Sequence, residues 1–353
     1  MKTCRKKIVI AAAAAALLVI GLAGCSGPGD DAVVAEVGKE KITFGVANFY
    51  ARMQQAQYET YYAGMMGTTP EEMWTQASGE DKTYEETTKE TILENLENMY
   101  ILSQHAEEYE ISITEEDKKA MEKAAGIFDE DNTLEDKDMV SGYKKNIEEV
   151  LKLATIQARM RTAMTADVDT EVSDEEAAQK SMQYVFFSYT SADESGNTVA
   201  LTEEEKKALQ TTAQEFADAL GADEAKNIEA AAANAGIEVQ TATFDAESTS
   251  PHADLVAAAD ALENAGDITG PIVTDGGIYV AKLTSLLDRE ATDAKKTSIV
   301  EERKQEQYNS LMEQWRKDTK IKVHKNVWKK IDFGDQGVTI VESQEEYTDE
   351  AME

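Results

Sequence analysis

The sequence predicts an α+β protein in which a small α/β unit lies between two helical segments. Apolar residues recur at helical spacing over much of the range 44–165. Near Thr170 the composition changes, and segments rich in β-branched and aromatic residues follow at 183–189 and 277–284. A charged amphipathic helix is then predicted at about 293–317. A chain of 353 residues is long enough for two domains, each with its own core.

The N-terminus has the pattern of a secretory signal peptide. Basic residues at positions 2, 5, 6 and 7 precede the uncharged apolar stretch 8–21. An apolar stretch of about 15 residues is too short for a membrane span, which needs roughly 20. The next four residues, Leu-Ala-Gly-Cys, end at Cys25 and resemble the bacterial lipobox. This resemblance implies that residues 1–24 are removed and that Cys25 carries lipid; the alternative is an uncleaved anchor with an incidental cysteine.

The charge balance excludes nucleic acid as a default partner. The chain has 35 Lys plus Arg against 69 Asp plus Glu, a formal net charge of −34. Loss of a signal peptide with four cations and no anion brings this charge to −38. Binding to phosphates requires clustered cations. Only three histidines, at positions 105, 252 and 324, and one cysteine lie beyond residue 24, so we expect no metal site and no cofactor.

The first half of the chain is predicted to be a hairpin followed by helices. Alternating apolar residues over 33–43 indicate two short strands around Gly38. Thr43 is then expected to cap a helix, and Thr114 with Asp117 forms a capping-box pattern for a helix ending near Gly126. Further long helices are predicted at about 84–109 and 137–165. Before the hairpin, residues 25–32 are predicted to form a flexible tether.

Methionines and aromatic residues concentrate between the first two predicted helices. Such adaptable apolar side chains are typical of surfaces that bind varied partners. An ordinary helix-packing core explains the same composition equally well. The cluster comprises Tyr58, Tyr61, Tyr62, Met65, Met66, Met73 and Trp74.

The α/β unit is predicted to combine three strands with three helices. Thr202 with Glu205 forms another capping-box pattern, and Gly236 follows an Ala-rich helix as a stop signal. Ser173 with Glu176 is expected to cap a further short helix. Residues 334–353 are acidic without a sustained apolar period, which predicts a disordered tail. Strands are expected at 183–189, 237–244, 277–284 and, beyond the unit, 321–323; helices are expected at 202–220, 223–235 and 255–262.

The run Gly-Asp-Ile-Thr-Gly-Pro-Ile-Val-Thr at 266–274, with the strand after it, resembles the C-terminal hairpin of parvulin-type (PpiC-type) peptidyl-prolyl isomerases. With the lipobox and flanking helices, the chain is similar to extracytoplasmic foldases of the PrsA and SurA type. This resemblance implies one chaperone domain built from 33–170 and 289–333, with strand 321–323 pairing near 33–37. A parvulin-like domain with a small antiparallel sheet, 171–288, would be inserted between the two parts.

The parvulin resemblance also implies where an isomerase site would lie. Catalysis of rotation about an X-Pro bond needs an apolar slot for the ring and polar groups aimed at the twisted amide. Tyr184 and Tyr279 occupy the positions where parvulins carry histidines, and Asp245 is the available loop carboxylate. Leu255, Phe186 and Ile278 are the candidate substrate-binding residues. The alternatives are core-facing aromatics, a solvated carboxylate, and a leucine that only packs on the sheet.

Three functions follow, in order of support. The first is a lipid-anchored foldase on the extracytoplasmic face of the cell membrane, which binds unfolded or newly secreted polypeptides and whose isomerase activity is weak or lost. The second is an active peptidyl-prolyl isomerase in which the tyrosines are functional. The third is a surface binding lipoprotein, either an adhesin or a solute-binding protein. The departures from the parvulin histidines favour the first over the second.

Overall fold

The structure is a computed structural model that describes residues 16–20, 28–79, 81–193, 195–334 and 337–341. The chain divides into two compact units, of which the first contains 1–167 with 306–353 and the second contains 168–305. Both ends of the chain therefore belong to the first unit. The expected boundary at 288 falls at the start of helix α11, Arg289–Asp318, which continues to Gln305 in the second unit and then enters the first.

A three-stranded antiparallel sheet joins the two ends of the chain within the first unit. Strands β2, Val33–Val37, and β3, Glu40–Thr43, form the predicted hairpin. Strand β10, Ile321–Val323, pairs with the other edge of β2, with Ile321 opposite Val37. The pairing that the foldase resemblance implied is therefore confirmed.

The helices of the first unit mostly begin where local capping signals place them. Thr114 and Thr83 each form a complete capping box, with the side chain accepting a backbone N–H and the third residue returning the bond. The helical elements are α1 (Phe44–Gln57), the π-helix η1 (Tyr58–Tyr62), α2 (Ala63–Met65), α3 (Pro70–Thr75), α4 (Tyr84–His105), the 3-10 helix η2 (Ala106–Tyr109), α5 (Glu115–Asp131), α6 (Leu134–Val140), α7 (Lys144–Met164) and α12 (Lys325–Trp328).

Two predicted helix boundaries are wrong. Helix α5 continues through Gly126 to Asp131, since a glycine inside a helix costs only about 1 kcal/mol and does not end it. The helix predicted at 137–165 is broken into α6 and α7 at Ser141, which has a φ of 53°. The Ser141 hydroxyl donates to Asp30 Oδ1 at 2.8 Å and accepts from Asn48 Nδ2 at 3.1 Å. Contacts far away in sequence therefore hold the break.

The last residues of the expected tether are part of the fold. Asp30 accepts hydrogen bonds from Ser141 and from Asn146 Nδ2, the latter at 3.0 Å, and its carbonyl accepts from Gly45 N. Three fixed partners leave Asp30 no freedom to act as a tether, so that prediction is wrong for this residue. The predicted lipidation residue, Cys25, lies outside the described residues.

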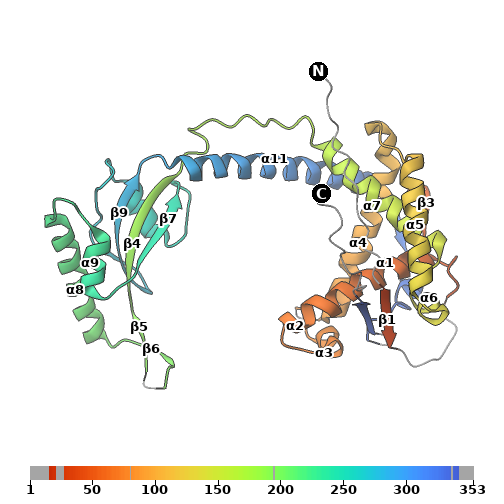
Figure 1. Cartoon of the computed structure of the whole chain (residues 1–353), viewed down its shortest axis with the longest axis horizontal. Coiled ribbons are helices and arrows are strands. Elements are labelled where there is room, and N and C mark those ends of the chain that lie inside the picture. The colour runs from red at the N-terminus through yellow and green to blue at the C-terminus, as the bar shows by residue number, and fades with distance from the viewer. Residues whose placement is uncertain (1–15, 21–27, 80, 194, 335–336, 342–353) are drawn as a thin grey trace, which may run out of the picture. The chain divides into compact units, whose positions relative to one another are not determined.

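Part of the expected disordered tail is also ordered. Residues Gly337–Val341 form strand β11, and Val338 is fully buried against α1. Strand β1, Ala16–Ile20, pairs antiparallel with β11, as Figure 1 shows beside α6. The tail prediction is therefore wrong for 337–341, because its alternating apolar residues find a non-local partner surface. Residues 342–353 lie outside the described residues.

The second unit is built on a four-stranded antiparallel sheet in the order β7-β4-β9-β8. Its long central strands are β4, Lys180–Ser188, and β9, Gly277–Ser285, with β7, Val239–Phe244, and β8, Ile272–Val273, at the edges. A small ribbon of β5, Thr190–Ala192, and β6, Thr198–Ala200, follows β4. The predicted small antiparallel sheet is thus confirmed.

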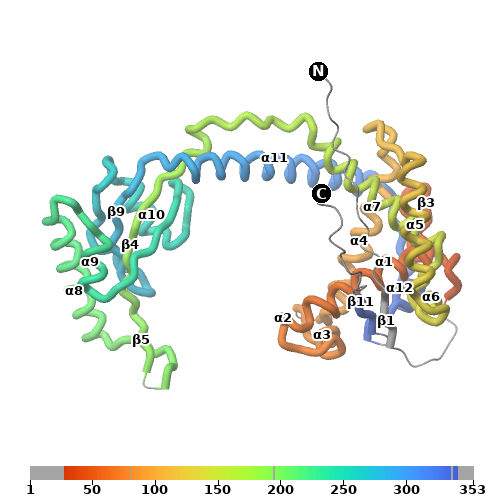
Figure 2. Tube along the Cα trace, viewed as in Figure 1, coloured from red at the N-terminus to blue at the C-terminus, as the bar shows by residue number. Residues whose placement is uncertain are grey.

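Helices cover both faces of this sheet. Helices α8, Glu203–Ala222, and α9, Ile228–Ala235, share a core with Val185, Phe187 and Val280, and lie together in Figure 1. Helix α10, Ala253–Asp260, packs on the opposite face, and its place is visible in Figure 2. Ser173 accepts from Glu176 N but starts only a turn, not the expected helix.

Within the described ranges, no helix is both long and apolar enough to cross a membrane. Over the same ranges, no three His, Cys, Asp or Glu side chains gather in a way that could hold a metal ion.

Candidate functional site

The α10 face of the second unit gathers the two tyrosines that the sequence singled out. Tyr279 on β9 lies opposite Phe186 on β4, and their rings stack with centroids 4.4 Å apart. The Tyr184 ring lies 5.9 Å from that of Tyr279. Alternation along the strands places all three on one face. The predicted pair of tyrosines therefore does converge, as an aromatic strip.

The two hydroxyl groups of this strip differ in their surroundings. Tyr184 is buried and its hydroxyl donates to Gln240 Oε1 on β7 at 2.6 Å. Tyr279 is only half-buried, and no described residue forms a hydrogen bond with its hydroxyl. Burial raises the pKa of both side chains, so both are neutral at pH 7. Tyr279 alone has a hydroxyl available to a bound amide.

Two of the predicted substrate-binding residues offer no open surface to this strip. Leu255 is fully buried on the side of α10 that packs against the sheet, in one core cluster with Tyr184. Ile278 is also fully buried, but on the opposite face, against α8 and α9, because neighbouring strand residues point to opposite sides. Ile278 is thereby excluded from a slot beside Tyr279. Of the three substrate-binding candidates, only Phe186 presents surface next to the tyrosines.

Asp245 lies at the far end of β7. It follows Phe244, which pairs with Lys180, whereas Tyr184 pairs with Gln240 four residues along the strand, about 13 Å away. The carboxylate accepts from Gln179 Nε2 at 2.9 Å and from Ser248 Oγ at 2.8 Å. Burial tends to raise the pKa of Asp245, but these hydrogen bonds outweigh it and the pKa is lowered. Asp245 thus organises its own loop as an ionised group.

A second candidate region lies in the first unit, where the predicted methionine and aromatic cluster divides into two parts. Trp74 and Met73 are buried in the main core, and Tyr58 packs against that core partly buried. Four other members are exposed on η1, on α2 and at the residue that ends α2, spaced so that positions i and i+4 adjoin on one surface. Both interpretations of the cluster therefore hold, each for part of it. The exposed members, here called the Tyr-Met patch, are Tyr61 (49%), Tyr62 (49%), Met65 (82%) and Met66 (44%).

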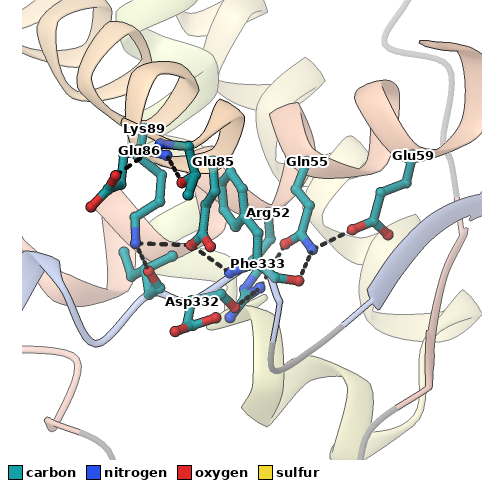
Figure 3. Close-up of polar contacts among 10 residues, drawn as sticks. Arg52, Gln55, Glu59, Glu85, Glu86, Lys89, Asp332 and Phe333 are labelled. Atoms are coloured by element: carbon teal, nitrogen blue, oxygen red, sulfur yellow. Dashed lines mark hydrogen bonds and ion pairs between the residues drawn. The ribbon is translucent and has the colours of Figure 1, made fainter. Parts of the chain in front are cut away.

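A buried polar network lies beside the Tyr-Met patch and holds the C-terminal segment, defined here as residues 331–334 and 337–341. Figure 3 shows Arg52, Gln55 and Glu59 along one side of the helix, directed at this segment. Arg52 Nη1 donates to the carbonyl of Asp332 at 2.9 Å, and Gln55 Nε2 donates to that of Phe333 at 3.2 Å. The segment is thus bound through its main chain.

Glu59 links this network to both the core and β11. Its Oε1 accepts from Trp74 Nε1 at 2.8 Å and from Gln55 Nε2 at 2.6 Å, and its Oε2 accepts from Val338 N at 2.6 Å. Burial raises the pKa of Glu59, and the three donors oppose that shift. On the other side, Glu85 Oε1 accepts from Phe333 N at 2.9 Å.

Sequence reasoning did not find this network. Its signal is present, since Arg52, Gln55 and Glu59 recur at i, i+3 and i+7 along α1 and η1. Polar residues at core positions of a helix indicate buried hydrogen-bond partners. Nothing in the local pattern indicates that those partners come from residues 332–338.

Comparison with known proteins supports the resemblance drawn from the sequence. Residues 1–141 match the sequence profile of the SurA-like N-terminal domain. The foldase protein PrsA of Clostridium botulinum (strain Langeland, type F) is 24% identical over 309 residues, covering 83% of this chain and 88% of that protein. This chain is similar to the PrsA foldases. The resemblance to PrsA- and SurA-type foldases is thus confirmed.

Solved structures with the same names align less closely. The foldase protein PrsA from Streptococcus pneumoniae is 18% identical with a TM-score of 0.30, covering 72% of this chain and 97% of that chain. A SurA-like chaperone of Campylobacter jejuni is 12% identical with a TM-score of 0.29, covering 83% and 99%. At these TM-scores neither structure supports a claim about this chain.

Proposed function

We propose that the protein is an extracytoplasmic foldase that binds unfolded secreted polypeptides through its SurA-like domain. The similarity to PrsA foldases supports this function. The observation that carries it is the Tyr-Met patch, because four large apolar side chains on one short helical stretch are exposed to solvent. Methionine and tyrosine side chains adapt to varied apolar partners without a fixed geometry. A patch of this kind suits transient binding of unfolded chains.

The same proposal includes attachment to the membrane through lipid on Cys25. The sequence Leu-Ala-Gly-Cys after an apolar stretch supports it. Mass spectrometry of the protein from its native membrane tests this point directly. A first residue Cys25 carrying a diacylglyceryl group is expected, and an unmodified cysteine followed by the intact signal would contradict it.

Isomerase activity in this proposal is weak or lost. The hydroxyl of Tyr184 is engaged by Gln240, Asp245 is about 17 Å along the strand, and Leu255 is covered. An isomerase needs polar groups that bind the twisted amide more tightly than the planar one, beside an open apolar slot. Tyr279 and Phe186 together offer one free hydroxyl and one partly exposed ring. They do not provide several polar groups beside an open apolar slot.

A test of client binding compares two exposed apolar sites. The double substitution Tyr61→Ser with Met65→Ser is expected to reduce suppression of aggregation of an unfolded secreted protein several-fold. Leu134→Ser is the matched control, because Leu134 is 67% exposed on α6, away from the Tyr-Met patch. Equal activity of both variants, or no suppression by the unaltered chain, would contradict the proposal.

Proline isomerisation is tested by a protease-coupled assay on a proline peptide. No acceleration over the uncatalysed rate at micromolar protein is expected. An acceleration that disappears in Tyr279→Phe would instead establish the alternative function, an active isomerase.

A further inference from the structure

The two edges of strand β11 have different partners. Val338 N donates to Glu59 Oε2 at 2.6 Å and Ile340 N donates to Thr60 Oγ1 at 3.0 Å, so one edge is bound by side chains from η1. The other edge pairs with β1, with Ala16 opposite Val341 and Ile20 opposite Gly337. Alternate residues of a strand direct their backbone groups to opposite edges. Each edge is therefore satisfied by a different part of the chain.

The strand that covers the second edge is the part of the chain expected to be removed. Strand β1, Ala16–Ile20, falls within the predicted signal peptide 1–24. Cleavage before Cys25 takes β1 away and leaves β11 with one open edge. An open edge presents a row of backbone donors and acceptors to any extended chain.

The fold holds β11 in place without help from β1. Val338 packs in a core cluster with Val46 and Phe49 of α1, and the preceding Phe333 packs on Trp74 with ring centroids 4.9 Å apart. Lys89, Arg52 and Gln55 bind three successive carbonyls, those of residues 331, 332 and 333. The mature chain therefore keeps the edge ordered, which lowers the entropic cost of binding a partner there.

We propose that the open edge of β11 is a binding site for an extended apolar segment of an unfolded polypeptide, added as an antiparallel strand where β1 lies in the precursor. This inference rests on the proposed foldase function and names the form in which a client binds. Main-chain pairing gives affinity with little dependence on sequence, which a foldase with many clients needs. The precursor strand Ala-Leu-Leu-Val-Ile indicates the preferred class, which is uncharged and aliphatic.

A second copy of the protein is the less suitable occupant. Pairing of two five-residue strands buries far less than the roughly 1,200 Å² of a stable interface. Two chains of net charge −34 or below also repel each other. An apolar client segment without acidic residues is not repelled, and transient binding of a client does not need the area of a stable interface.

Binding is tested on the chain 26–353 with a fluorescent peptide that carries Ala-Leu-Leu-Val-Ile between two pairs of lysines. Since Val338 and Ile340 direct their N–H groups to η1, the β1 residues that exchange hydrogen bonds with β11 are 16, 18 and 20. N-methylation at the position of Leu18 is expected to weaken binding at least about tenfold. N-methylation at the position of Val19, with the same charge and composition, is expected to leave it unchanged.

The matching protein variants alter the strand itself. Thr339→Pro removes a backbone N–H on the β1 side of β11 and is expected to abolish peptide binding, whereas Thr339→Ala keeps it; circular dichroism checks that both variants fold. Equal binding of the two methylated peptides overturns strand addition. So does a dimer of the unaltered chain that Thr339→Pro converts to monomer.

The same preparations are assayed for suppression of aggregation. Suppression of aggregation without peptide binding overturns the edge site and leaves the foldase function standing. Peptide binding without suppression of aggregation overturns the foldase function and leaves strand addition at the edge standing.

Discussion

At the scale of single residues, Glu97 places a carboxylate in the interior of the first unit, where it needs a cationic partner. Only 3% of Glu97 is exposed on α4, and its Oε2 accepts from Arg316 Nη2 at 2.6 Å. Arg316 lies near the end of α11 and also donates to Asn98 Oδ1 at 2.9 Å. Burial raises the pKa of Glu97, and the guanidinium opposes this shift. The pair fixes the end of α11 to α4.

Arg316→Leu is therefore expected to destabilise the protein in a pH-dependent manner. The substitution leaves an ionised carboxylate buried without its cation. The expected loss of stability at pH 7 is about 2–4 kcal/mol, which is less than for a fully buried pair because Arg316 is partly exposed. The pKa of Glu97 in the folded state then rises further above its unfolded value of about 4.3. The loss of stability is complete above the pKa of Glu97 in the folded variant, and it shrinks as the pH falls toward about 4.3.

Urea unfolding at pH 7 and near pH 4.5 measures this effect. The double variant Glu97→Gln with Arg316→Leu is the control, and it is expected to be more stable at pH 7 than Arg316→Leu alone. A loss of the same size at both pH values would show that the carboxylate is not responsible.

At the scale of elements, Gly277 sets how closely β9 approaches β4. Its φ is 157°, and a Cβ there would lie 2.3 Å from the carbonyl oxygen of Phe187 and 2.6 Å from the Phe186 ring. No side chain larger than hydrogen fits between these strands. Its neighbour Gly276 has only one atom within reach of a Cβ, Phe186 Cζ at 3.9 Å.

Gly277→Ala is expected to lower the free energy of unfolding of the second unit by about 2–4 kcal/mol, since strand β9 must move or the backbone must strain. Gly276→Ala is the matched control and is expected to change it by less than about 1 kcal/mol. Chemical denaturation followed by the near-ultraviolet signal of Tyr279 and its aromatic neighbours checks both. Equal stability of the two variants would refute the close approach.

What the sequence could predict at this scale depended on how local the cause is. The capping boxes at Thr114 and Thr202 involve residues three positions apart, and both form as predicted. The break at Ser141 and the strand β11 depend on Asp30, Asn48 and Glu59, each about 90 or more residues away. Such pairings leave no mark in a local pattern, so the helix was predicted unbroken and the tail disordered.

In the candidate site, too, local features could be predicted from the sequence and non-local ones could not. The resemblance to parvulins placed Tyr184 and Tyr279 on the first and last strands of the small sheet, and these two strands, β4 and β9, do pair. Strand alternation, whose period of two is a local property, assigns Ile278 to the opposite face, a consequence that the resemblance to parvulins had obscured. The distance of Asp245 depends on the register of β7 against β4, which pattern alone does not specify.

At the scale of the whole molecule, the net charge sets which clients the protein meets. The formal charge is −34, or −38 without the predicted signal peptide, and it is carried by a chain with 69 acidic residues. A field of one sign attracts oppositely charged polypeptides and repels like ones. The apolar sites that we propose, such as the Tyr-Met patch, would then act on a population already enriched in basic unfolded chains.

Client capture is accordingly expected to weaken with salt for basic clients and to be nearly unaffected for acidic ones. The Debye length falls from about 10 Å at 0.1 M to about 3 Å at 1 M, so long-range attraction is screened while apolar contacts persist. Association rates of an unfolded basic and an unfolded acidic secreted protein, measured by stopped-flow fluorescence at both salt concentrations, check this. A basic client whose association rate does not fall with salt would rule out electrostatic selection, and binding would then depend on the apolar sites alone.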